Sequence, residues 1–319
     1  MPRIACWTTT DIASRHRYWR FSRVTIVRTR FNLPSMRWSH ILPTVIAALL
    51  VFAGIPTQTA HGTEQACGPE EACLLEGGSY HAKVPAGWDG VSPLPLLTYF
   101  HGYGQTGRTV IAMKSLTKAA EDAGALIIAP NGIDKAWSVR GAPPDRRDEV
   151  AFAAAVVEDA ATRWPIDRSR LWISGFSLGA SMAWDIACLA GDRYAGFFPV
   201  SGAFWRPHPV GCPAGPVTMI HVHGRGDKVV PLAGRTIRGQ WRQGDVLESF
   251  EILRRHNQCE LPEIESTGPR GLRCREWNRC DGGSRLALCL YDGGHAAPRD
   301  WYPRAFEWLN GAAKAKTAG

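Results

Sequence analysis

Runs of apolar residues alternate with helix-like segments along most of the chain. A strand buried on both faces reads as a nearly continuous apolar run. Such runs occupy residues 94–100, 125–129, 171–173, 196–200 and 217–222. Segments with helical spacing or composition cover residues 109–123, 149–164, 180–189, 244–256 and 300–309. This alternation predicts an α/β fold, a mostly parallel sheet covered by helices on both faces.

Two weaker patterns add strands at the margins of this sheet. Residues 79–84 alternate polar and apolar positions, as a first, edge strand does. Residues 272–277 and 285–291 read as a hairpin. If its turn lies near Asp281-Gly282, Glu276 pairs with Ala287.

The first sixty residues differ in composition from the rest. They hold eight of the 37 basic and one of the 29 acidic residues, which leaves 29 basic and 28 acidic residues in 61–319. The high overall charge is therefore no argument for a nucleic-acid partner. The apolar run at 41–54 has signal-peptide length and is short for a membrane span.

We therefore expect residues 1–60 to be a signal or leader region, with Met36 as the candidate true start. A cytoplasmic tail on a membrane anchor is the alternative. Residues 61–319 are expected to form a single catalytic domain, because about 255 mature residues suffice for one α/β core.

Eight of the nine cysteines follow the leader, an even number that suits an oxidising compartment. No Cys-x-x-Cys pair has the spacing of zinc ligands, so the sequence offers no metal site. Cys274 and Cys289 face each other in a hairpin register that pairs Glu276 with Ala287. Cys280 is then free to reach Cys259. Although eight cysteines allow 105 connectivities, the favoured pairs are Cys67–Cys73, Cys188–Cys212, Cys259–Cys280 and Cys274–Cys289.

Residues 170–180 read R-L-W-I-S-G-F-S-L-G-A, an apolar strand, a tight turn and a helix. This is the context of a nucleophile elbow, G-x-S-x-G, with Ser177 at its tip. The turn strains the backbone of the serine, so the residues two before and two after it must be glycines to avoid clashes. The helix start leaves backbone N–H groups free to face charge that develops beside Ser177.

A nucleophilic serine needs an imidazole to take its proton and a carboxylate to orient that imidazole. In α/β-hydrolases these follow in the order serine, acid, histidine, each at the end of a strand. His295, in a glycine turn directly after a strand, is the best-placed base. Asp227 follows the preceding strand by a similar turn, whereas Asp245 and Asp281 are less well placed. An ordinary turn aspartate and a solvent-facing loop histidine are the alternatives.

An oxyanion hole needs two backbone N–H groups held ready for charge on the substrate oxygen. One is expected from Leu178, directly after the nucleophile. The other is expected from Tyr103, in the H-G-Y-G turn that ends the strand at 94–100.

These motifs together resemble the secreted esterases of the polyhydroxybutyrate depolymerase group, relatives of feruloyl and acetylxylan esterases. The similarity spans most of residues 67–309. It rests on Y-F-H-G (99–102), D-E-V-A-F (148–152), G-F-S-L-G (175–179), H-G-R-G-D (223–227) with Val230-Pro231, and G-G-H (293–295). Tyr103 replaces the small residue or cysteine common in the group, and Ala296-Ala297-Pro298 replaces a Trp-Pro segment. Both positions border the acyl pocket, so they weaken inference about the substrate.

The resemblance implies an α/β-hydrolase fold and a secreted or periplasmic serine esterase that needs no cofactor. Its substrates would be short-chain polyhydroxyalkanoate-type, feruloyl or acetyl esters, small or polymeric, with no nucleic-acid and no stable membrane partner. Trp137, Trp205 and Trp301 are candidates to line the cleft, with core packing as the alternative. Acyl transfer or peptide hydrolysis on the same triad remains open. A non-catalytic binding protein is disfavoured, because no triad member is missing.

Overall fold

The computed structural model describes residues 67–143, 145–260 and 264–317. The expected leader therefore lies outside the described residues, as does the candidate start at Met36. The chain divides into two units, Met1–Thr59 and Ala60–Gly319, and the described residues all belong to the second. Within the described ranges no helix has the length and apolar character needed to span a membrane.

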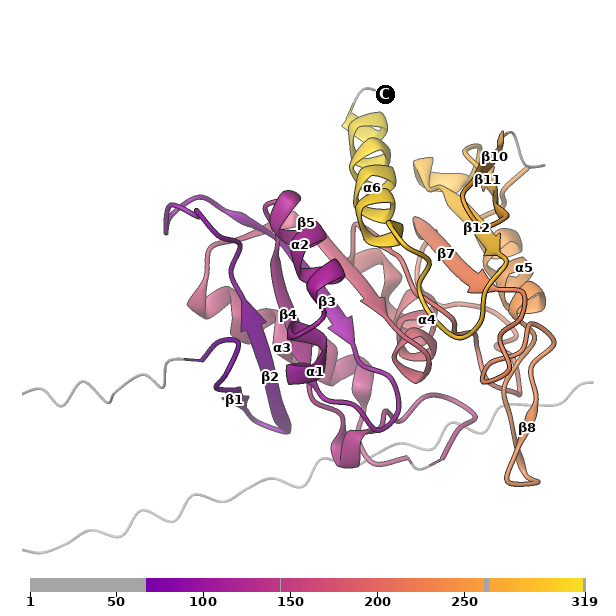
Figure 1. The fold of residues 1–319 in the computed structure, drawn as a ribbon, viewed down its shortest axis with the longest axis horizontal. Coiled ribbons are helices and arrows are strands. Elements are labelled where there is room, and N and C mark those ends of the chain that lie inside the picture. Colours follow the sequence, from indigo (N-terminus) through magenta and orange to yellow (C-terminus); the bar gives the residue numbers. More distant parts are fainter. Residues whose placement is uncertain (1–66, 144, 261–263, 318–319) are drawn as a thin grey trace, which may run out of the picture. The chain divides into compact units, whose positions relative to one another are not determined.

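One ten-stranded sheet forms the centre of this unit, in the order β1-β2-β4-β3-β5-β6-β7-β12-β11-β10 (Figure 1). The strands from β4 to β12 in this order run parallel, and two antiparallel strands extend the sheet on each side. The sheet strands are β1 (Cys73–Leu75), β2 (Gly78–Lys83), β3 (Leu94–Phe100), β4 (Leu126–Pro130), β5 (Ile166–Gly175), β6 (Gly196–Phe197), β7 (Met219–Gly224), β10 (Ile264–Gly268), β11 (Leu272–Trp277) and β12 (Leu286–Tyr291).

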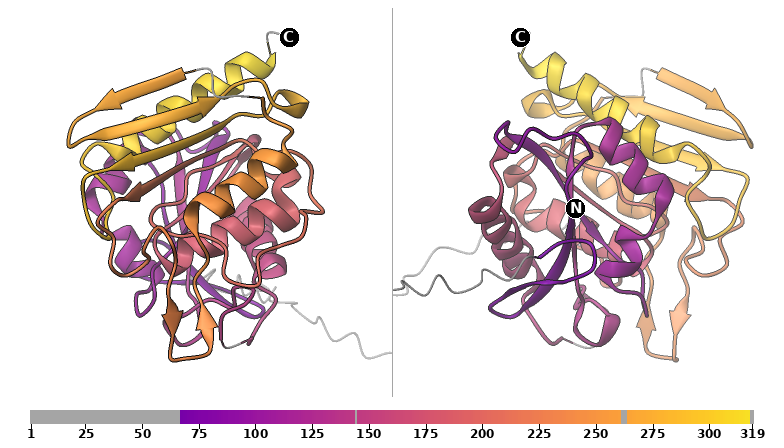
Figure 2. Two further views of the ribbon diagram at one scale, coloured as in Figure 1. Left: turned by 90° about the vertical axis from the view of Figure 1, so that its right-hand side faces the viewer. Right: turned by 60° about the vertical axis from the view of Figure 1, so that its left-hand side comes forward.

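Helices cover both faces of the sheet (Figure 2). One face packs against α1 (Gly107–Ile111), α2 (Lys114–Asp122) and α6 (Trp301–Thr317). The other packs against α3 (Glu149–Arg163), α4 (Leu178–Ala190) and α5 (Val246–His256). Short 3-10 helices occupy Ile133–Lys135, Gly191–Arg193 and Asp281–Gly283.

The central strand β3 shows how the apolar pattern specifies these layers. All seven of its residues are buried, as a strand covered on both faces requires. Leu97 and Tyr99 join the core beneath α1, α2 and α6. Leu96 and Phe100 belong to the cores on the opposite face, because successive side chains of a strand point to opposite sides. The predicted α/β fold is therefore observed.

Two expectations about elements need correction, and one hairpin was not expected. The helix expected over 109–123 is two helices, since Met113 adopts an extended conformation (φ −75°, ψ 93°) between α1 and α2. The strand near 79–84 is not an edge strand, because β1 pairs with its outer side. A hairpin of β8 (Thr236–Ile237) and β9 (Trp241–Arg242) has no counterpart among the expected elements, and it projects at the bottom of the left view in Figure 2.

Four disulfides reinforce the unit, and they join the same pairs that the sequence suggests. Cys274 and Cys289 are direct cross-strand partners in β11 and β12, where Glu276 also lies opposite Ala287. The bond between Cys188 and Cys212 ties the C-terminal half of α4 to the loop between β6 and β7.

Candidate active site

Ser177 occupies a sharp turn between β5 and α4. Its backbone has φ 56° and ψ −119°, outside the regions that ordinary residues favour. A Cβ atom on Gly175 would lie 2.3 Å from the Gly179 carbonyl oxygen, and one on Gly179 would lie 2.1 Å from the Phe100 carbonyl oxygen. Both glycines are therefore required by the close approach of this turn to the end of β3.

The structure brings the side chains of Ser177, His295 and Asp227 together. His295 Nδ1 lies 2.6 Å from Asp227 Oδ2, and His295 Nε2 lies 2.8 Å from Ser177 Oγ. An ionised carboxylate can only accept a hydrogen bond, so the His295 proton sits on Nδ1. Nε2 then presents its lone pair to the serine hydroxyl, the geometry needed for proton abstraction.

Asp227 is a buried residue in an otherwise mostly exposed turn after β7. Its Oδ1 accepts hydrogen bonds from the Val229 and Val230 N–H groups, each at 2.8 Å. Burial raises the pKa of this carboxyl, but the hydrogen bonds from His295 and the two backbone groups outweigh it and hold the pKa below its usual value. The carboxylate is therefore ionised at neutral pH and available to orient an imidazole.

The loop that carries His295 is fixed from two sides. The Tyr291 hydroxyl lies within hydrogen-bonding distance of the Gly294 and Ala296 carbonyl oxygens, at 3.0 and 2.7 Å. The imidazole of His295 lies 4.7 Å from the ring of Phe176, centroid to centroid. Phe176, a variable position of the elbow motif, thus packs against the His295 ring, a contact that sequence reasoning missed.

The two expected oxyanion donors lie on adjacent strand ends. β3 and β5 are parallel neighbours, so the turn containing Tyr103 follows β3 beside the elbow. Among the described residues, neither the Leu178 nor the Tyr103 N–H is engaged in a hydrogen bond. The Gly102 N–H is different, since it donates to Gln105 Oε1 at 3.0 Å. Sequence reasoning also missed this bracing role of Gln105, for which the only signal was a polar residue in a glycine turn.

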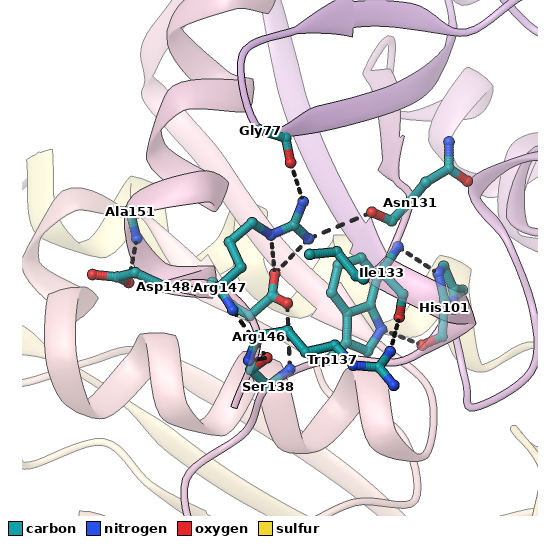
Figure 3. Close-up of polar contacts among 12 residues, drawn as sticks. Gly77, His101, Asn131, Ile133, Trp137, Ser138, Arg146, Arg147, Asp148 and Ala151 are labelled. Carbon is teal, nitrogen blue, oxygen red and sulfur yellow. Dashed lines mark hydrogen bonds and ion pairs between the residues drawn. The ribbon is translucent and has the colours of Figure 1, made fainter. Parts of the chain in front are cut away.

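A polar scaffold adjoins the turn that carries Tyr103, and it includes His101 and Trp137, whose contacts are drawn in Figure 3. His101 Nδ1 donates to the Gly102 carbonyl at 2.8 Å, while its Nε2 accepts the Gly132 N–H at 3.0 Å. Trp137 Nε1 donates to the His101 carbonyl at 2.7 Å. Because every contact uses a defined donor or acceptor, the buried imidazole is locked in one tautomer and fixes the backbone at 101–102.

The D-E-V-A-F segment has a structural role beside this scaffold (Figure 3). Asp148 caps α3 by accepting the Ala151 N–H at 2.9 Å. Glu149 is buried and pairs with Arg147 at 2.6 Å, and Arg147 also donates to the Gly77 carbonyl at 2.7 Å. These contacts join α3 to the turn before β2.

The tryptophans expected to line a cleft separate into two groups. Trp137 and Trp301 are each only 1% exposed, so neither presents a surface to substrate, and their predicted binding role is wrong. Trp137 braces the backbone instead, and Trp301 packs in the core beneath α6. Trp205 is half-buried and remains a candidate.

Across the described ranges, no group of three or more His, Cys, Asp or Glu could hold a metal ion.

Comparisons with known proteins agree with this geometry. A sequence model of the phospholipase/carboxylesterase family matches residues 151–243. The chain is 27% identical over 230 residues to a probable feruloyl esterase C of Aspergillus niger, covering 69% of this chain and 77% of that protein. It is 24% identical over 269 residues to feruloyl esterase C of Emericella nidulans, covering 80% and 90%.

The fold is also similar to a solved structure. Acetyl xylan esterase from Aspergillus awamori superposes with a TM-score of 0.55 at 14% identity, covering 73% of this chain and 94% of that one. At this identity the likeness supports the fold alone. The family match and the sequence relatives support a carboxylic ester hydrolase, and the solved structure supports an α/β-hydrolase fold.

Proposed function

We propose that Ser177, His295 and Asp227 form the catalytic triad of this esterase. The Ser177 Oγ attacks the ester carbonyl carbon while its proton passes to His295 Nε2, and the proton then leaves with the alcohol. Water, deprotonated by the same nitrogen, releases the acyl group and regenerates the serine. The observation that carries the proposal is a continuous chain of two hydrogen-bonding contacts. One joins Ser177 Oγ to His295 Nε2, and the other joins His295 Nδ1 to the buried Asp227 carboxylate.

The negative charge on the substrate oxygen needs donors that are fixed before the reaction. We assign these to the Leu178 and Tyr103 N–H groups, which make no hydrogen bond to any residue that the structure describes. The hydrogen bonds that Gln105 and His101 make to Gly102 support this assignment. They fix the turn next to Tyr103 and leave the Tyr103 N–H without a hydrogen bond to them.

For the substrate, we propose a short or extended ester such as a feruloyl or acetyl ester, with hydroxybutyrate oligomers as the third candidate. Support comes from the names of the sequence relatives, feruloyl esterases that align over most of this chain. A second support is Trp205, half-buried on the loop that begins at Gly202. A Cβ on Gly202 would lie 2.8 Å from the Ser177 carbonyl oxygen, so this loop starts against the nucleophile.

We further propose that the chain is secreted, with residues 1–60 as its leader and residues 61–319 as one catalytic domain. The four disulfides support an oxidising compartment. Mass spectrometry of protein exported by its host tests this proposal. An N-terminus near residue 61 is expected, and an intact leader on exported protein would contradict it.

Two assays test the substrate assignment. A chain-length series of p-nitrophenyl esters should show kcat/KM falling as a gradient from short to long acyl chains, since each methylene changes discrimination by only ~1–3 kcal/mol. A panel of methyl ferulate, acetylated xylan and hydroxybutyrate oligomers then separates the candidates. A steady rise in kcat/KM from acetate to palmitate would refute the proposed preference.

A further inference from the structure

Behind the proposed triad lies a pair of buried histidines that the proposed mechanism does not use. His223, at the end of β7, is fully buried, as is His221 two residues earlier. His223 Nε2 lies 2.8 Å from the Val230 carbonyl oxygen and 3.5 Å from Asp227 Oδ2. His221 Nε2 lies 3.2 Å from His223 Nδ1.

The chemistry of these contacts fixes the position of each proton. A carbonyl oxygen can only accept, so His223 Nε2 carries a proton and donates it to Val230. Burial lowers the pKa of both imidazoles, so both are neutral at physiological pH. A neutral imidazole that is protonated on Nε2 has a lone pair at Nδ1. His223 Nδ1 therefore accepts a hydrogen bond from the His221 Nε2–H group.

Val230 links this pair to the catalytic carboxylate. Its carbonyl oxygen accepts from His223, and its N–H donates to Asp227 Oδ1 at 2.8 Å. His223 therefore fixes the position of Val230 by a hydrogen bond, and Val230 in turn fixes the Asp227 carboxylate. In the opposite tautomer, the lone pair of His223 Nε2 would face two acceptors, the Val230 carbonyl and Asp227 Oδ2, and would repel both.

We propose that His223 is a positioning residue for the Asp227 carboxylate, and that His221 acts behind it by stabilising the tautomer in which His223 Nε2 donates. This inference rests on the proposed catalytic triad. The competing interpretation is that the two imidazoles merely fill the core and satisfy each other.

Two substitutions at one position distinguish the interpretations. In His223→Gln the side-chain amide reaches the position of Nε2 and can still donate to Val230. In His223→Asn the amide reaches only the position of Nδ1. With p-nitrophenyl acetate, we expect kcat/KM of His223→Gln to stay within about fivefold of wild type. We expect His223→Asn to lose about 10²-fold, mainly in kcat, as a misplaced catalytic group does.

The role of His221 is tested by a double-mutant cycle with His221→Phe, which keeps an aromatic ring packed against Trp184. Alone, His221→Phe should lower kcat/KM at least tenfold, because His223 Nδ1 loses its donor and the Nε2-protonated tautomer loses that stabilisation. In the His223→Gln background it should have little effect, since an amide has no tautomers. The low-field NMR resonance of the His295 Nδ1 proton should weaken in His221→Phe and persist in His223→Gln.

Wild-type activity of His223→Asn, or equal effects of His221→Phe in both backgrounds, would overturn the proposal in favour of core packing. If His223→Asn does not fold, the cycle with His221→Phe still decides. Failure of the triad itself gives a different result, because Ser177→Ala would then retain activity, and the inference would fall together with the proposed triad.

Discussion

Gln105 Oε1 accepts the Gly102 N–H at 3.0 Å, and this bond closes the turn from which the Tyr103 N–H projects. Tyr103 itself is 71% exposed, so its side chain does little to hold that turn. Gln105→Leu removes the acceptor while leaving the Tyr103 N–H in place. We expect kcat to fall about tenfold with little change in KM, less than the 10²–10³-fold loss of a whole oxyanion donor.

Steady-state kinetics with p-nitrophenyl acetate measure this effect. Gln240→Leu is the matched control, because Gln240 is exposed in the turn between β8 and β9. Equal kcat values for Gln105→Leu and Gln240→Leu would show that Gln105 does not brace the oxyanion turn.

The buried carboxyl of Asp185, on α4, should make the free energy of unfolding depend on pH. Its carboxyl is 4% exposed and accepts the Arg140 N–H at 2.8 Å. Burial raises the pKa of Asp185 to about 7, against the opposing effect of that hydrogen bond. The folded protein therefore keeps a proton that the unfolded chain releases at its ordinary pKa of about 4. This contribution to stability is complete below pH 4 and is lost as the pH rises through 7.

Urea unfolding at pH 5 and pH 8 checks this sign. For wild type, Asp185 should contribute a fall in unfolding free energy on the order of 2 kcal/mol over that interval. Asp185→Asn should remove that part of the fall, since the amide still accepts from Arg140 and does not ionise. Asp145→Asn, at an exposed position, serves as the control. An unchanged slope in Asp185→Asn would contradict the prediction.

The disulfide between Cys188 and Cys212 closes a loop with a sequence separation of 24 residues. Replacing both with alanine should lower the unfolding free energy by about 3 kcal/mol, because the unfolded chain regains conformational entropy. Cys67 and Cys73 are separated by only six residues, so the same replacement there should cost about 2 kcal/mol. Chemical denaturation under non-reducing conditions measures both. A larger loss for the shorter loop would show that entropy does not govern these bonds.

Much of this fold could be predicted from local patterns. The bounds of β3 follow from an apolar run buried on both faces, and the start of α3 follows from Asp148 as its N-cap. The register of β11 and β12 follows from pairing Cys274 with Cys289 across the connection at 278–285. In each case a short stretch of sequence contains the physical cause of the structure.

Other features depend on contacts between distant segments, which no local pattern reveals. Trp137 and Trp205 look alike in the sequence, yet only the fold buries the first against the His101 carbonyl. The strands β8 and β9 are two residues each, too short to produce an apolar alternation. His223 lies in a recognisable motif, but its contact with Val230 appears only once the turn at 227–230 has folded.

The central claim is that Ser177 is the nucleophile of this esterase. The most direct test compares kcat of Ser177→Ala and wild type with p-nitrophenyl acetate, with circular dichroism confirming that the variant is folded. The proposed mechanism predicts a loss of turnover on the order of 10⁶-fold, down to the limit of detection in most assays. Turnover equal to that of wild type in the folded Ser177→Ala variant would contradict it.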